Sequence, residues 1–332
     1  MNINTLNRIL VFIPLAIAIL IEVKTFKIWE QIQFLWDKGA SPIHQLFILS
    51  PHSFRYFLMY PVVSIPENLG IDKNFFFSLI ALLLGFLTAG LIINSVKLIN
   101  REQRRLNTAS LFISCFIVFL LFFMNGRGVF ALFGFALLVN NITKLIIGIS
   151  PNIWMFANIF LALLFCSVSS GTLAVSFLTF TIYLFSQLQQ NTSSVLHLRP
   201  SKSHFLLFLV GLLFCVIFSS MIVVGLIKNL DFYGSGYEGF VKMFGHGLGV
   251  FFIPLLNAMS LPILVTVSIL VAIIFNFVAK TFRHPFIVRI LFICVACGLF
   301  GYTTLSMAIV PLLIMLSSLL PDFKLFKVRS SV

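Results

Sequence analysis

The sequence predicts an all-α integral membrane protein, folded as a polytopic transmembrane helical bundle of about ten helices. Three features predict this fold. Of the 332 residues, 60% are hydrophobic and only 9% are charged, whereas soluble domains carry about 25% charged residues. The apolar stretches are about 16 to 25 residues long, the length that spans a hydrocarbon core. No period-two alternation of apolar and polar residues runs through them, which argues against a β-barrel.

We expect one integral membrane domain over residues 1–332, because apolar segments follow one another along the whole chain. The first has no small-residue cleavage site behind it, so a retained helix is expected. The last two are joined by almost no loop, which predicts a tight hairpin or one broken helix. Pro254 and Pro262 interrupt the region that starts near Leu248, as in a half-helix. The expected spanning segments are residues 7–24, 75–96, 107–124, 129–149, 153–169, 172–188, 204–227, 255–279, 286–304 and 305–321.

We expect the protein to lie in the plasma (inner) membrane. The charge distribution predicts that both of its termini face the cytoplasm. Basic clusters at 97–105, 280–289 and 324–329 fall on one side of the predicted topology, and such clusters mark the cytoplasmic side. Of the nine acidic residues, all but Glu102 and Asp322 fall on the other side. The net charge of +13 is therefore explained by topology, and no nucleic-acid partner is expected.

Two outer loops are long enough to carry function, residues 25–74 and 228–250. The first contains a Trp-rich amphipathic stretch and then a Pro-punctuated apolar patch, and it is expected to lie in the interface or to re-enter the membrane. Within the patch, His52 and Arg55 are candidates to bind a phosphate or move a proton. The alternative is an interfacial loop with ordinary headgroup contacts.

The second outer loop gathers Asp231, Tyr237, Glu238 and His246 among several glycines. Glu238 and His246 are candidates for a general base, because burial can move the pKa of either group into the working range. Aromatic rings beside carboxylates are a common surface for holding sugars, by stacking and by hydrogen bonds to hydroxyls. A solvated, charge-balanced loop is the alternative.

Arg127 stands in a short turn between two strongly apolar segments, flanked by Gly126 and Gly128. Glycines let a backbone or ligand approach closely, and the guanidinium presents a planar donor fork that matches phosphate and carboxylate. These features predict a contact to an anionic lipid-linked group. The alternative is an arginine that reaches the headgroup level without a specific ligand.

Other polar features favour structural roles. Asn140, Asn141 and Lys144 are expected to reach the membrane interface from the end of their helix, and residues 169–172 to pack helices closely. Cys294 and Cys297 form a CxxC without a second pair or a His partner, which favours apolar packing. Because nucleotide motifs and metal-ligand spacing are missing from the sequence, we expect no cofactor and no metal.

The order of these features resembles a family. A long outer loop leads through Gly70-Ile71-Asp72 into the second helix, a basic cytoplasmic loop follows, and the turn from Asn125 to Ala131 opens a helix with an arginine. This layout, with the late outer loop, resembles the Wzy/EpsG-type polysaccharide polymerases of O-antigen and exopolysaccharide clusters. Members tend to carry a His after the arginine segment, and this chain has none between Phe165 and Thr172.

The resemblance implies a metal-independent glycosyltransferase that joins undecaprenyl-pyrophosphate-linked oligosaccharide repeat units on the non-cytoplasmic face. Arg127, with Arg55 or Lys73, would hold the donor pyrophosphate, and Glu238 or His246 would deprotonate the acceptor hydroxyl. The remaining expected substrate contacts are His52, Asp231 and Tyr237.

The partners expected on this reading are the lipid-linked oligosaccharide, membrane lipids, and a chain-length regulator or flippase. Two alternatives remain open, a transporter or flippase for a lipid-linked or amphipathic solute and a non-enzymatic subunit of a larger membrane assembly. Broken helices with ionisable residues near the midplane would mark the transporter.

Overall fold

The computed structural model describes the chain in several stretches, which are helical apart from short turns and connections. These stretches are residues 30–47, 51–99, 126–150, 152–194, 261–280, 285–299 and 305–319, with single residues and short runs between 110 and 120 and between 209 and 236. No strand occurs among these residues, so the all-α class is confirmed for the described part of the chain. The expected first segment, 7–24, lies outside the described residues.

Seven of the helices coincide with expected spanning segments. The described residues of two more expected segments, 107–124 and 204–227, are helical as well. The helices are α2 (Glu30–Asp37), α3 (Pro42–Phe47), α4 (Pro51–Leu69), α5 (Lys73–Ile99), α7 (Gly126–Ile146), α8 (Ile153–Cys166), α9 (Ser170–Ser194), α13 (Leu261–Lys280), α14 (Pro285–Leu299) and α15 (Leu305–Leu319).

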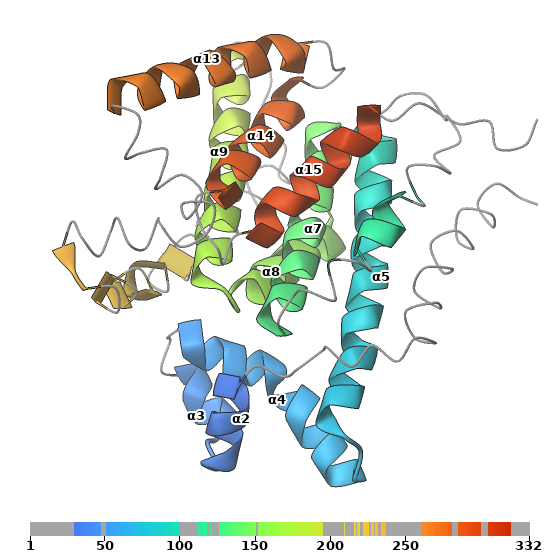
Figure 1. The fold of residues 1–332 in the computed structure, drawn as a ribbon. Coiled ribbons are helices and arrows are strands. Elements are labelled where there is room, and N and C mark those ends of the chain that lie inside the picture. Colours follow the sequence, from blue (N-terminus) through green and yellow to red (C-terminus); the bar gives the residue numbers. More distant parts are fainter. Residues whose placement is uncertain are drawn as a thin grey trace, which may run out of the picture.

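Helix α7 is the centre of the bundle (Figure 1). It packs against α5, α8, α9 and α15, and 83% of its apolar window is buried, compared with 50% for α5. Close approach to α8 depends on Gly134: a Cβ at this position would lie 2.8 Å from the Ala162 carbonyl oxygen and 2.9 Å from the Cys166 nitrogen. Small residues at helix crossings are typical of membrane bundles.

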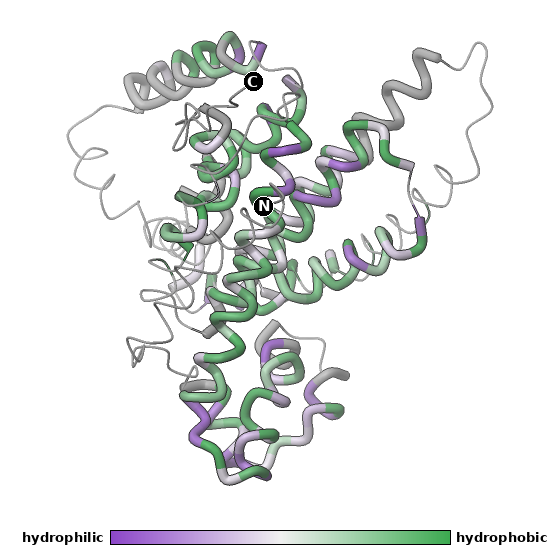
Figure 2. The backbone as a smooth tube through the Cα atoms, turned by 90° about the vertical axis from the view of Figure 1, so that its right-hand side faces the viewer, coloured by the Kyte–Doolittle hydropathy of each residue, from purple (hydrophilic) through white to green (hydrophobic). Residues whose placement is uncertain are grey.

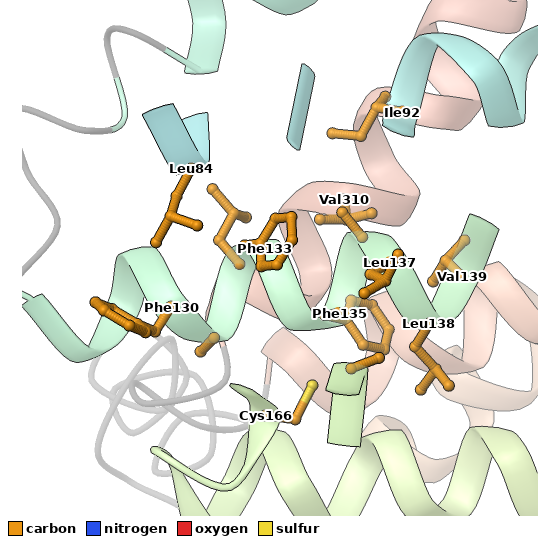
Figure 3. Packing of buried hydrophobic residues seen from close by; sticks show 14 of the residues in the cluster. Leu84, Ile92, Phe130, Phe133, Phe135, Leu137, Leu138, Val139, Cys166 and Val310 are labelled. Carbon is orange, nitrogen blue, oxygen red and sulfur yellow. The ribbon is translucent and has the colours of Figure 1, made fainter. Parts of the chain in front are cut away.

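The directions of the central helices follow from their side-chain contacts. Figure 3 shows α5 and α7 running the same way, with Leu84 towards Phe130 and Ile92 towards Val139. Helix α8 runs in the opposite direction, because Phe165 near its end stacks on Phe130 near the start of α7, at 5.6 Å between ring centroids. Since α5 and α7 are parallel, the chain between them must return along the bundle, as the expected segment 107–124 requires.

Two described helical stretches are long and apolar enough to cross a membrane, Lys73–Ile99 and Gly128–Ile146. Helix α5 also has the surface of such a helix. Large apolar side chains at every fourth position, Phe75, Leu79, Leu83 and Leu87, are exposed along one face. Residues on its other side are buried, including the small residues Ala81, Gly85 and Ala89 at the same spacing. A continuous exposed apolar stripe suits a helix that faces lipid.

The first expected outer loop contains three packed helices rather than an irregular segment. Helices α2, α3 and α4, which we call the α2–α4 unit, lie at the end of the bundle where α5 begins (Figure 1). They pack together, and α4 also packs against α5. Hydrophilic residues gather around this unit, whereas long stretches of the bundle are hydrophobic (Figure 2).

The junction between α4 and α5 is built from the Gly70-Ile71-Asp72 sequence. Helix α4 continues through Pro61 and Pro66, so the prolines do not divide this patch. It ends at Gly70, whose φ of 65° allows the Ile71 nitrogen to donate to the Pro66 carbonyl at 2.9 Å. The Asp72 carboxylate then accepts from the Phe75 nitrogen at 2.7 Å, which caps α5.

The last helices differ in part from expectation. Helices α14 and α15 pack closely against each other, which favours a hairpin over a single broken helix. Helix α13 lies across the end of the bundle in both views (Figures 1 and 2), and Phe275 stacks on Phe292 of α14 at 3.8 Å. Pro262 is the second residue of α13, a position that does not break a helix.

Candidate functional site

The expected catalytic pair cannot be placed in the fold. Glu238 and His246, together with Tyr237, lie outside the described residues. Of the same loop, Asp231 is described: it is exposed and accepts a hydrogen bond from the Ser235 hydroxyl at 3.2 Å. The second outer loop therefore contributes only this one carboxylate to the described part of a site.

Arg127 is the second residue of α7, and its position along the bundle can be derived. The Asn140 amide lies against Leu91 and Ser95 of the parallel helix α5. Arg127 comes 13 residues earlier, so it lies level with residue ~80 of α5, about two turns or ~10 Å beyond Lys73. The start of α7 thus faces the end of the bundle that carries the α2–α4 unit. Free backbone N–H groups at a helix start also favour an anion there.

Arg55 lies within α4 and is 4% exposed. A guanidinium is rarely buried so completely unless it is paired, so Arg55 differs from an exposed arginine that contacts lipid headgroups. His52 is in the first turn of the same helix. The structure therefore puts both residues on one helix of the α2–α4 unit, near its start and at the end away from the junction with α5.

Lys73, the first residue of α5, takes part in a cluster that joins three helices. Its ammonium lies 2.6 Å from a carboxylate oxygen of Glu67 and 5.7 Å from the centre of the Trp36 ring. Trp36 and Tyr60 are half-buried neighbours, with ring centroids 5.3 Å apart. We call Trp36, Tyr60, Glu67 and Lys73 the aromatic–lysine cluster.

Tyr56 packs against the aromatic–lysine cluster through the ring of Tyr60. Its ring is fully buried, its hydroxyl donates to the Ala40 carbonyl at 2.9 Å, and its ring meets the edge of Tyr60 at 5.7 Å. Burial, and secondarily the neighbouring Tyr60, raises the pKa of Tyr56 above the ordinary tyrosine value. Tyr56 therefore stays neutral at physiological pH and serves as a hydrogen-bond donor that fixes the position of Tyr60.

Only Lys73 of the aromatic–lysine cluster was expected as a site residue from sequence. Signals for two others were present: Trp36 belongs to the Trp-rich stretch, and Tyr60 follows Tyr56 at the i,i+4 spacing that places two side chains on one helical face. Because the four residues come from α2, α4 and α5, their meeting depends on the packing of these helices and cannot be read from spacing alone.

The interpretation of Asn140 and Asn141 as residues that reach the interface is wrong, because they are 0% and 1% exposed. The Asn140 amide donates to the Leu91 carbonyl at 3.2 Å and to the Ser95 hydroxyl at 3.0 Å. The Asn141 amide donates to the Leu137 carbonyl of its own helix at 2.8 Å. Burial of these polar groups is offset by hydrogen bonds inside the bundle.

The expected packing roles of residues 169–172 and of Cys294 are confirmed where they are described. Ser169 and Thr172 are 3% and 0% exposed. Cys294 is buried, with its sulfur 3.1 Å from the Thr179 hydroxyl of α9. Among the described residues, no group of three His, Cys, Asp or Glu side chains is arranged to hold a metal ion.

The chain matches no protein-family model, no curated protein and no solved structure.

Proposed function

We propose that this chain is a multi-pass protein of the plasma (inner) membrane, with about ten helices and both termini in the cytoplasm. On the non-cytoplasmic face it joins undecaprenyl-pyrophosphate-linked oligosaccharide repeat units. One observation carries the proposal. Arg127 is the second residue of α7, the more buried of the two long apolar helices, at the end of the bundle that holds the polar and aromatic α2–α4 unit. An arginine at this end is suited to hold a lipid-linked pyrophosphate at the membrane surface.

The proposed reaction needs a stabilised leaving group and a base. The Arg127 guanidinium binds the donor pyrophosphate and stabilises the negative charge that develops as the sugar–phosphate bond breaks. Glu238 or His246 takes the proton of the acceptor hydroxyl, which attacks the sugar carbon. The lipid pyrophosphate leaves, and the chain grows by one repeat unit.

The test is a gene deletion with complementation, read as the ladder of surface polysaccharide on a gel. The wild-type gene restores the ladder, and Arg127→Ala leaves single repeat units only. Lys144→Ala is the matched control, because it removes a basic side chain from the opposite end of the same helix, and it restores the ladder. Equal amounts of each variant in the membrane fraction establish insertion. A normal ladder with Arg127→Ala contradicts the proposal.

A transporter or flippase is the second candidate, favoured by the buried polar contacts of Asn140 with α5. Polar groups inside a membrane bundle often line solute pathways. The same deletion separates the two candidates. Loss of a polymerase leaves single repeat units at the cell surface, whereas loss of a flippase leaves the lipid-linked units on the cytoplasmic side and none at the surface.

A further inference from the structure

The aromatic–lysine cluster has the chemistry of a carbohydrate-binding surface. The Trp36 and Tyr60 rings lie side by side at an interplanar angle of 53°, and both are only half-buried. An aromatic ring offers a flat apolar face for the C–H face of a sugar, and tryptophan and tyrosine combine such a face with a polar group. The two rings present aromatic surface near the junction of α2, α4 and α5.

The ion pair beside these rings supplies the polar contacts that a sugar requires. Glu67 and Lys73 are 50% and 24% exposed, so both remain accessible at the surface. A carboxylate accepts hydrogen bonds from hydroxyl groups, and an ammonium donates hydrogen bonds to them. The Lys73 ammonium, 5.7 Å from the Trp36 ring centre, places these polar atoms beside the aromatic surface.

The charge balance of the cluster favours a sugar over a phosphate as its ligand. Glu67 already neutralises Lys73 at 2.6 Å, and its carboxylate repels a second anion. A neutral polyol meets no such repulsion and can bond to both partners of the ion pair. The pyrophosphate contact therefore belongs to Arg127 and not to Lys73.

The cluster is also held in a fixed shape, which lowers the cost of binding. Tyr56 is anchored to the Ala40 carbonyl and supports the Tyr60 ring from the edge. The Asp72 cap and the Gly70 turn fix the start of α5, and with it the backbone of Lys73. These contacts position the site before any ligand arrives.

We propose that Trp36, Tyr60, Glu67 and Lys73 form a saccharide subsite that holds a sugar ring of the oligosaccharide. The assignment rests on the proposed function for the identity of the glycan, because that function brings lipid-linked oligosaccharides to this face. Arg127 then binds the pyrophosphate at the start of α7, and the subsite binds sugar residues at the α2–α4 unit.

The test uses the purified full-length chain in detergent and oligosaccharides released by mild acid from the surface polysaccharide of the wild-type host. Saturation-transfer NMR and calorimetric titration detect binding to the wild-type chain. Glu67→Gln keeps the size of the side chain and weakens binding about tenfold, the loss expected for a charged hydrogen bond. Trp36→Leu abolishes binding.

Phe34→Ala is the matched control. Phe34 lies on the same helix, is 54% exposed and has the Lys38 ammonium 4.1 Å over its ring, but it is outside the cluster. This variant binds like the wild type. Thermal unfolding in the same detergent checks that each variant is folded, and Glu67→Gln remains informative if Trp36→Leu does not fold.

The outcomes for the subsite and for the polymerase are separate. No binding by the wild-type chain overturns the subsite even if deletion abolishes the polysaccharide ladder. An unchanged ladder after deletion, with binding that Glu67→Gln weakens, overturns the polymerase and keeps the subsite. Inorganic pyrophosphate is the competitor: it leaves oligosaccharide binding unchanged, and displacement of the sugar by pyrophosphate contradicts the assignment. Equal loss of binding with Phe34→Ala contradicts it as well.

Discussion

Asn140 joins α5 and α7 through both amide hydrogens of one side chain. They reach the Leu91 carbonyl and the Ser95 hydroxyl, and Asn94 approaches the Asn140 oxygen at 3.5 Å. In a membrane bundle, where lipid is as apolar as the helix surface, such contacts and close packing hold helices together. Asn141, one residue further, bonds only within its own helix. Two adjacent residues of the same type therefore differ in what they connect.

We predict that Asn140→Leu destabilises the folded chain by about 1 kcal/mol, the usual size of a hydrogen bond between membrane helices. The variant loses all three hydrogen bonds to α5, whereas the Asn141→Leu control loses a single contact inside α7 and costs less. Unfolding in detergent micelles by increasing sodium dodecyl sulfate, followed by circular dichroism, measures the free energy of unfolding. Equal destabilisation by the two variants would contradict the assigned role of Asn140.

The sequence places single residues less reliably than it places helices. Asn140, Asn141 and Lys144 form a polar group near the end of an apolar segment, a pattern equally typical of an interface. Whether such residues reach the interface or are buried in the bundle depends on whether a neighbouring helix offers hydrogen-bond partners. Here α5 offers them to Asn140. The aromatic–lysine cluster was missed for the same reason, because Trp36, Tyr60 and Lys73 meet only through packing between helices.

At the level of elements, the long apolar segments were predictable and the short helices were not. Segment 75–96 corresponds to α5 (Lys73–Ile99) and segment 153–169 to α8 (Ile153–Cys166), because hydropathy over such a length depends little on context. The α2–α4 unit is different. Its helices are short or contain Pro61 and Pro66, so local propensity argues against them, and packing against one another and α5 stabilises them instead.

The crossing of α7 and α8 depends on one glycine, and this gives a prediction for the pair of helices. Gly134→Ala puts a Cβ within 3 Å of the Ala162 carbonyl oxygen and the Cys166 nitrogen, both backbone atoms that cannot rotate away. We expect a loss of about 1–3 kcal/mol, the cost of overpacking. Gly90→Ala on α5 is the control, because no atom lies within 4 Å of its added Cβ. It should be neutral or stabilising by up to ~1 kcal/mol.

The same detergent unfolding experiment measures both glycine variants. A Gly134→Ala chain as stable as the wild type would mean that α7 and α8 are further apart than the structure places them. Loss of stability in Gly90→Ala would show instead that alanine is unfavourable on these helices for another reason. The two variants together separate contact between helices from helix propensity.

For the whole molecule, the parallel arrangement of α5 and α7 decides which segments lie at the same end of the bundle. The α2–α4 unit precedes the start of α5, so it lies on the side where both helices begin. Lys97 near the end of α5 and Ile149 just after α7 lie on the other side. In the proposed topology, the basic residues at 97–105 place that second side in the cytoplasm.

We therefore predict opposite labelling of two engineered cysteines in a variant whose five native cysteines are replaced by serine. Lys38→Cys, exposed after α2, reacts with a membrane-impermeant maleimide in intact cells. The native Ile149 side chain is 42% exposed, and Ile149→Cys reacts only after the cells are permeabilised. Lys97→Cys behaves in the same way. Labelling of Lys38→Cys and Ile149→Cys from one side would mean that α5 and α7 do not both cross the membrane in the same direction. Labelling of Ile149→Cys alone in intact cells would reverse the orientation and move the α2–α4 unit, with its proposed saccharide subsite, to the cytoplasm.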